Sequence, residues 1–314
     1  MLRRSPGLCF AVAAGGYFAL WLVVPRATFL PVLTSLIDGI MPFSPASVSG
    51  CLSLAVMVLV GAPTVAFMAI QIAIVYFFAR FEMSWKRCAL VLVGSLVGVA
   101  GIAVLVVWQS GVAAKMGRHP NWRETLYIMG AYPSLLKMPM HLAIIVAASS
   151  IGYLVSLRVR DRNLLLPVVM FAAYVDFWTV TQGPVSAVLK KAPEVALAVA
   201  APIPAAGTGA FVPRTFVGPG DFLFMALVFA AVHRLALDGA RNYWFIFAGM
   251  TLGMLAVMFG FLPALPALVV LAISVVAANW GKFRLTRQEA LSTAIVGLLL
   301  LASLPLVWSA LRRL

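Results

Sequence analysis

Two aspartates, Asp176 in FAAYVDFWTV and Asp221 in VGPGDFLFMAL, lie inside apolar stretches of membrane-spanning length. An ionisable group inside a span costs about 2.5–3.5 kcal/mol on insertion scales, and such residues are usually paired or functional. These two are therefore the strongest candidates for chemistry among the nine acidic residues. The others lie near Lys or Arg in loops, or at a helix end, and are interpreted as solvated pairs and caps: Asp38, Glu82, Glu124, Asp161, Glu194, Asp238 and Glu289.

The two aspartates are predicted to lie at similar depth in the membrane. Asp176 is six residues before Gln182, the expected end of its span, which is about 9 Å at 1.5 Å per residue. Asp221 is five residues after Phe216, the expected start of the next span, or about 7–8 Å. Consecutive spans run antiparallel, so both carboxylates fall under the same membrane face.

Such a pair favours acid–base chemistry. Gly218 and Gly220 remove side chains where the two helices need to approach each other closely. Two carboxylates in a low-dielectric site cannot both ionise comfortably, so they share a proton, as in aspartic proteases. The carboxylate takes a proton from water while the carboxylic acid protonates a peptide carbonyl oxygen, and a gem-diol forms and collapses. We expect neither a metal nor a cofactor.

The elements that position these residues are expected to be membrane helices. The chain has 314 residues, 63% of them hydrophobic and 10% charged, against roughly 45–50% and 25% in soluble domains. The net charge of +14 comes from basic residues in twos and threes between apolar runs. That distribution is typical of membrane proteins, and no basic–aromatic platform for nucleic acid is present.

Nine apolar runs are long enough to cross a bilayer. The sequence therefore predicts an all-α polytopic membrane protein, with about nine transmembrane helices in a single domain over 1–314. Residues 1–158 form N-terminal helices, 159–288 the catalytic helices and 289–314 a C-terminal helix. The runs lie near 7–24, 51–79, 88–108, 139–157, 163–182, 217–237, 242–261, 263–280 and 290–310. The second is either one kinked helix or two short ones, because Gly61-Ala62-Pro63 interrupts it.

Short basic loops on the N-terminal side place the N-terminus in the cytoplasm, in a prokaryotic cytoplasmic membrane, with the active-site loop exoplasmic. That loop, 183–216, is rich in proline and contains two β-compatible stretches, VALAVAA and GAFVPRTF. Both a hairpin next to the membrane and an irregular interfacial loop fit this composition.

Three motifs follow one another in these spans. They are Tyr174-Val175-Asp176, Gly218-Pro219-Gly220-Asp221 and Pro263-Ala264-Leu265-Pro266. At these residues the sequence resembles the GxGD intramembrane aspartyl proteases, the family of presenilin and signal peptide peptidase, over roughly 163–280. The motifs are similar to the family's Tyr-Asp, GxGD and PAL motifs, and the two aspartates fall in consecutive spans.

The resemblance implies a presenilin-like fold and a role for each motif residue. Asp176 and Asp221 would be the catalytic pair, and Gly218 and Gly220 would shape the start of the GxGD helix. The segment Pro263, Ala264, Leu265 and Pro266, with Tyr174, would bind the substrate. Prolines lack N–H donors, so an irregular helix start leaves backbone groups free to pair with an unwound substrate, to which the 183–216 loop can add a strand. The substrates would be single-span membrane proteins or signal-peptide remnants within the lipid bilayer.

One position departs from the family pattern. Val175 separates Tyr174 from Asp176, whereas the family's tyrosine directly precedes its aspartate. At about 100° per residue the two side chains are roughly 200° apart on a helix. Either the helix is unwound there, or the role of the tyrosine is lost.

Two other functions stay open. A proton-coupled transporter or channel also uses intramembrane carboxylates and proline-broken helices, although no matching halves are visible here. A catalytically inactive scaffold is the third possibility. Other intramembrane proteases are disfavoured, because there is no HExxH or GxSG motif and His119, His141 and His233 are isolated in the sequence. Cys9, Cys51 and Cys88 are interpreted as packing residues.

Overall fold

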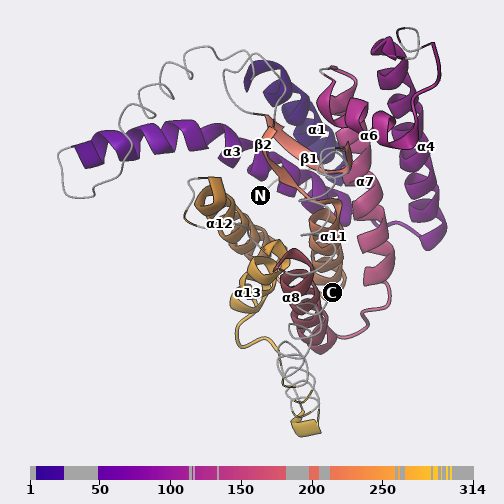
Figure 1. The fold of residues 1–314 in the computed structure, drawn as a ribbon. Helices are drawn as coiled ribbons and strands as arrows, with labels where there is room; N and C mark the ends of the chain where they lie inside the picture. The colour runs from indigo at the N-terminus through magenta and orange to yellow at the C-terminus, as the bar shows by residue number, and fades with distance from the viewer. Residues whose placement is uncertain are drawn as a thin grey trace, which may run out of the picture.

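The computed structural model describes residues 5–24, 49–112, 115, 117–132, 134–181, 198–204, 213–258, 261, 266–283, 286–288, 291, 295 and 298. Most of these residues are helical (Figure 1). The long helices form a bundle, and a short pair of strands contacts α7 and α12.

In the N-terminal half, the described residues form five α-helices. They are α1 (Pro6–Val23), α3 (Ser49–Ala79), α4 (Trp85–Gln109), α6 (Trp122–Ala131) and α7 (Lys137–Ser156). The α3 helix is continuous through Pro63 over 31 residues, about 46 Å at 1.5 Å per residue. The apolar run 51–79 is therefore one helix and not two.

The C-terminal half carries both aspartates. A single 3₁₀ turn, η2 (Arg162–Leu164), leads into α8 (Leu165–Thr181), which contains Asp176. Two strands follow, β1 (Ala201–Pro204) and β2 (Pro213–Val217). The described chain continues with α11 (Pro219–Arg234), which begins with the GxGD motif, α12 (Gly239–Met258) and α13 (Ala267–Ala278).

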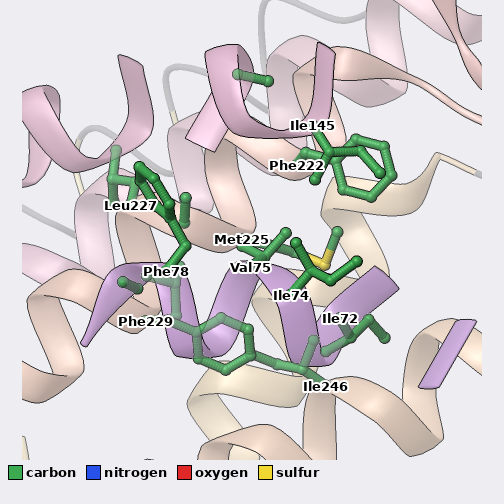
Figure 2. Close-up of a cluster of buried hydrophobic side chains, with 14 of the residues drawn as sticks. Ile72, Ile74, Val75, Phe78, Ile145, Phe222, Met225, Leu227, Phe229 and Ile246 are labelled. Carbon is green, nitrogen blue, oxygen red and sulfur yellow. The ribbon is translucent and has the colours of Figure 1, made fainter. Parts of the chain in front are cut away.

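Helix α11 lies at the centre of the bundle, in contact with α3, α7, α8, α12 and α13. Every residue from Met225 to Val232 is buried, so this helix is covered on all sides. Figure 2 shows Phe222, Met225, Leu227 and Phe229 of α11 among aliphatic side chains that include Ile74 and Val75 of α3, Ile145 of α7 and Ile246 of α12. A helix that is hydrophobic all round is a core helix, and the sequence of α11 follows this pattern.

Helices α7 and α11 approach each other closely at Gly152 of α7. A Cβ atom at this position would collide with the backbone carbonyl oxygen of Leu223 and lie 3.0 Å from the Cβ of Ala226. At the far end of the same pair, the guanidinium of Arg234 donates to the carbonyl of Ser156 at 2.6 Å. Glycine at residue 152 therefore sets how closely α11 approaches α7.

Five described helices are long and apolar enough to cross a membrane, which supports an integral membrane protein. They are Pro6–Val23, Gly61–Ala79, Trp85–Gln109, Lys137–Ser156 and Arg162–Val180. Helix α4 is largely exposed along its apolar length, as expected of a lipid-facing span.

The predicted count of nine spans is not confirmed. Helices α11 and α13 have only 16 and 12 residues, since they begin after Gly218 and after Pro266. The first turn of α12 carries Arg241 and Asn242, which lower its hydropathy. Most of the ninth run, 290–310, lies outside the described residues.

The two strands form an antiparallel hairpin within the 183–216 loop. Ala201 pairs with Val217 and Ile203 with Thr215, and the register shifts between Ile203 and Pro204. Of the two interpretations of this loop, the hairpin is thus confirmed. Its first strand begins only at Ala201, the last residue of the VALAVAA stretch. The predominantly α-helical fold class is confirmed, with this two-stranded hairpin as its only sheet within the described residues.

Candidate active site

Asp221 lies in the first turn of α11, directly after the hairpin. Strand β2 ends at Val217, Gly218 caps the helix and Pro219 occupies its first position. Proline suits that position because the missing N–H has no intrahelical partner there. The half-buried carboxylate of Asp221 accepts a hydrogen bond from the Gly218 N–H through Oδ2, at 3.1 Å. Its location is therefore set by its own helix start.

Asp176 lies in the second half of α8, and its carboxylate is bound by another helix. Its Oδ2 accepts a hydrogen bond from the backbone N–H of Leu268 at 2.9 Å. Leu268 is in the first turn of α13, just after Pro266. The first N–H groups of a helix have no intrahelical acceptor, so this carboxylate satisfies one of them and faces the positive end of the helix dipole.

The two carboxylates meet across three helices. Helix α13 packs against α8, and α11 contacts both of them. The charge of Asp176 acts directly on Asp221. Two acidic groups from separate helices and one backbone donor from a third therefore share a site inside an apolar bundle.

The expected clearance role of Gly218 and Gly220 is wrong within the described residues. A Cβ at Gly218 would lie 3.4 Å from the Asp221 Oδ2, which is ordinary contact with a side chain of its own helix turn. At Gly220 no described atom would lie within 4 Å. The close approach that these glycines were expected to permit occurs instead at Gly152 on α7.

The PAL segment is described only at its last residue. Pro263, Ala264 and Leu265 lie outside the described residues, so their expected contact with substrate is not addressed. Pro266 precedes α13 in an extended conformation, with φ −69° and ψ 94°, and makes no side-chain cap. The role of Leu268 was not predicted from the sequence, although the first turn of a helix that begins directly after Pro266 is where an unused N–H donor is expected.

Tyr174 and Asp176 lie on one regular helix, since α8 is continuous from Leu165 to Thr181. The suggestion that the helix is unwound at Val175 is therefore wrong. The two side chains leave α8 on opposite faces, about 200° apart. Tyr174 is not placed beside the Asp176 carboxylate by helix geometry.

Three of the remaining acids act as caps, as expected. Asp161 accepts from the Asn163 N–H at 3.0 Å, and Asp238 accepts from the Arg241 N–H at 3.0 Å. Glu124 belongs to the capping box that begins α6. No group of three or more His, Cys, Asp or Glu side chains with the spacing of a metal site occurs in the described part of the chain.

The comparisons with known proteins return no match. No protein-family model, no curated protein sequence and no solved structure matches this chain. The resemblance to the GxGD proteases therefore depends on the three motifs alone, and the function is inferred from the site.

Proposed function

We propose that this protein is an intramembrane aspartyl protease, with Asp176 and Asp221 as its catalytic pair. The observation that carries the proposal is that Asp176, bound at the N-terminus of α13, lies close enough to Asp221 of α11 for the two charges to interact. Caps and surface pairs do not need two half-buried acids brought together inside an apolar bundle. Intramembrane carboxylates that are retained at this cost are functional by default.

The proposed mechanism follows from one proton shared by two carboxyl groups. The ionised group takes a proton from a water molecule, and the water oxygen bonds to the carbonyl carbon of the scissile peptide. The protonated group gives its proton to the carbonyl oxygen, which yields a neutral gem-diol. Collapse of the gem-diol breaks the C–N bond. The carboxyl that took the water proton gives it to the amine nitrogen, while the other carboxylate takes a proton from a gem-diol hydroxyl, so the pair again shares one proton. Each carboxylate has one backbone N–H donor, from Gly218 or Leu268, which holds it in place without blocking its second oxygen.

The hairpin gives a physical means of presenting an extended substrate. Peptide bonds in a helix are hidden by their own hydrogen bonds, so the substrate has to unwind locally before it is cut. Strand β2 ends at Val217, four residues before Asp221, and a two-stranded sheet offers unpaired N–H and C=O groups along its edges. An unwound segment can pair with such an edge and reach the dyad. We therefore propose single-span membrane proteins and signal-peptide remnants as the substrate class.

The deciding experiment is a cleavage assay with the purified, reconstituted protein. A panel of single-span substrates is incubated in liposomes, and the products are mapped by mass spectrometry relative to the membrane. We expect one cut within or near the span, and complete loss of cleavage in Asp176→Ala and in Asp221→Ala. A hydroxyl-bearing transition-state isostere is expected to block the wild-type reaction.

The same liposomes distinguish the two alternatives. A proton-coupled transporter moves protons or solute across the bilayer, depends on the aspartates for this, and leaves every substrate intact. A scaffold is indifferent to both substitutions. An intact substrate panel with wild-type protein, together with aspartate-dependent flux, would replace the protease proposal with the transporter.

A further inference from the structure

A second group of buried polar side chains lies between α1, α3 and α7, apart from the two aspartates. It consists of Tyr17 and Trp21 of α1, Gln71 of α3 and His141 of α7, all with at most 1% of their surface exposed. We refer to these four residues as the α1–α3–α7 polar cluster. All four lie within helices long enough to span the membrane.

Aromatic contacts join the members of the cluster. The ring of His141 stacks on Trp21 with centroids 5.8 Å apart and an interplanar angle of 21°. Phe67 of α3 contacts Tyr17 and Trp21 edge-on, at 6.0 and 6.4 Å. The Tyr17 hydroxyl lies within interaction range of Gln71. Tyr17 and Trp21 of α1 therefore link Gln71 of α3 with His141 of α7 in the interior of the bundle.

Gln71 and His141 have hydrogen-bonding capacity that the protein does not use. Both amide atoms of Gln71 and both ring nitrogens of His141 are buried without a partner at full hydrogen-bond geometry. The Tyr17 hydroxyl lies within range of Trp21 and Gln71 but does not reach that geometry with either. A polar atom buried in apolar surroundings loses its hydrogen bonds to water. If no protein group replaces them, its burial is energetically unfavourable. Nearly all such atoms in folded proteins have a partner, and bound water supplies it where protein groups do not.

We infer that the α1–α3–α7 polar cluster is a hydrated site, in which water molecules bridge Gln71, His141 and Tyr17 inside the membrane. A buried water typically makes about three hydrogen bonds and requires polar partners on several sides. The Gln71 amide has both donor and acceptor atoms, and a neutral His141 imidazole has one donor and one acceptor nitrogen. The Tyr17 hydroxyl can donate or accept. One or two waters therefore satisfy all three side chains.

The surroundings explain why this site is hydrated while the core around α11 is dry. The α11 core is lined by side chains without polar atoms, such as Met225, Leu227 and Phe229. One turn before His141, the buried ammonium of Lys137 binds the Gly130 carbonyl at 2.7 Å, and its charge acts on His141. Lys137 thus extends the polar surroundings of His141 toward the N-terminal end of α7.

X-ray radiolytic footprinting of the reconstituted wild-type protein tests the inference. Radiolysis of a bound water releases a hydroxyl radical in place, so side chains beside it are oxidised even when they are buried. Oxidation rates of Tyr17, Trp21 and His141 are measured by mass spectrometry and divided by their rates in the unfolded chain. We expect these ratios to exceed those of Met225 and Phe229 severalfold. Ratios as low as those of the two dry-core residues would overturn the inference.

A variant pair tests which residues hold the water. Gln71→Leu removes the amide and is expected to lower the oxidation ratio of Tyr17 severalfold. The matched control, Ile74→Leu, changes a buried α3 side chain of the dry core and should leave that ratio unchanged. Undiminished oxidation of Tyr17 in folded Gln71→Leu contradicts a water bridged by Gln71. If Gln71→Leu does not fold, the wild-type ratios decide alone.

Discussion

The two aspartates are held in different ways. Asp221 belongs to α11, the most enclosed helix of the bundle, and is fixed by a hydrogen bond within its own first turn. Asp176 belongs to α8, where Phe171 and Phe177 are exposed, and is fixed by the backbone of α13. The position of Asp221 thus depends on local structure and core packing, whereas that of Asp176 depends on how one peripheral helix docks on another. Any motion that separates α8 from α13 is expected to dismantle the dyad from the Asp176 side.

The largest effect is expected when either carboxyl becomes an amide. Asp176→Asn and Asp221→Asn keep an oxygen that can accept the hydrogen bond from Leu268 or Gly218. Neither variant can exchange a proton with water or substrate. We expect cleavage to fall by at least about 10³-fold in both, while the thermal unfolding temperature stays the same or rises because the charge repulsion is gone. A variant that still cleaves would remove that residue from the pair.

The next effect concerns the backbone donor to Asp176. Leu268→Pro removes the N–H within the first helical turn, where proline is tolerated, and Leu268→Ala removes the side chain but keeps the donor. A hydrogen bond to a charged group contributes about 1.5–3 kcal/mol, so we expect kcat/KM to fall roughly 10- to 100-fold in the proline variant beyond the fall in the alanine variant. Equal loss in both variants would show that packing of Leu268, and not its N–H, matters.

The enclosure of α11 is tested at Gly152. Gly152→Ala places a methyl group against the α11 backbone at Leu223, and overpacking of this kind costs about 1–3 kcal/mol. The matched control is Gly98→Ala on α4, where no described atom lies within 4 Å of the new Cβ. We expect the free energy of unfolding in mild detergent to fall for Gly152→Ala only. A similar response from both variants would mean that α11 can move away from α7 at little cost.

The docking of α13, on which Asp176 depends, is tested at two buried asparagines. Asn242 of α12 and Asn279 at the end of α13 exchange side-chain hydrogen bonds of 3.1 and 2.7 Å. Replacing one by leucine leaves the other amide partly unpaired, at a cost of about 1–3 kcal/mol. We expect the double variant to lose less than the sum of the two single variants, with a coupling energy of about 0.5–3 kcal/mol. Strict additivity would show that the pair does not act as a unit.

These differences also explain which parts of the molecule the sequence could predict. Helix positions followed from apolar runs, because a helix in lipid satisfies its backbone internally, and the two acids stood out because a charge in such a run is costly. The roles of Gly152 and Leu268 did not follow, since each depends on which helix lies opposite. Gly218 and Gly220 matched a motif, but the close helix approach in the structure is between α7 and α11, at Gly152. The lengths of α11 and α13 were overestimated because hydropathy does not mark where the hairpin and the PAL segment end.

The smallest effect is expected at Glu124, a partly exposed acid that caps α6 and pairs with Arg118. Like Asp221, it accepts the N–H of its N-cap residue, Asn121, at 2.7 Å. The hydrogen-bonded Arg118 guanidinium and this N–H lower the pKa of Glu124 below its ordinary value of 4.5. A lowered pKa stabilises the folded state above the ordinary value, and this contribution is lost as the pH falls through the folded-state pKa.

Amide hydrogen exchange in α6 reports this contribution. Protection factors, corrected for intrinsic exchange, should fall slightly as the pH is lowered from about 6 to 3 in the wild type, and Glu124→Gln should abolish the change. Cleavage should be the same in both proteins. If Asp221 were also only a cap, Asp221→Asn would behave like Glu124→Gln, with a small local effect and full activity. The difference between these two amide variants therefore separates a carboxylate that starts a helix from one that also carries a proton in catalysis.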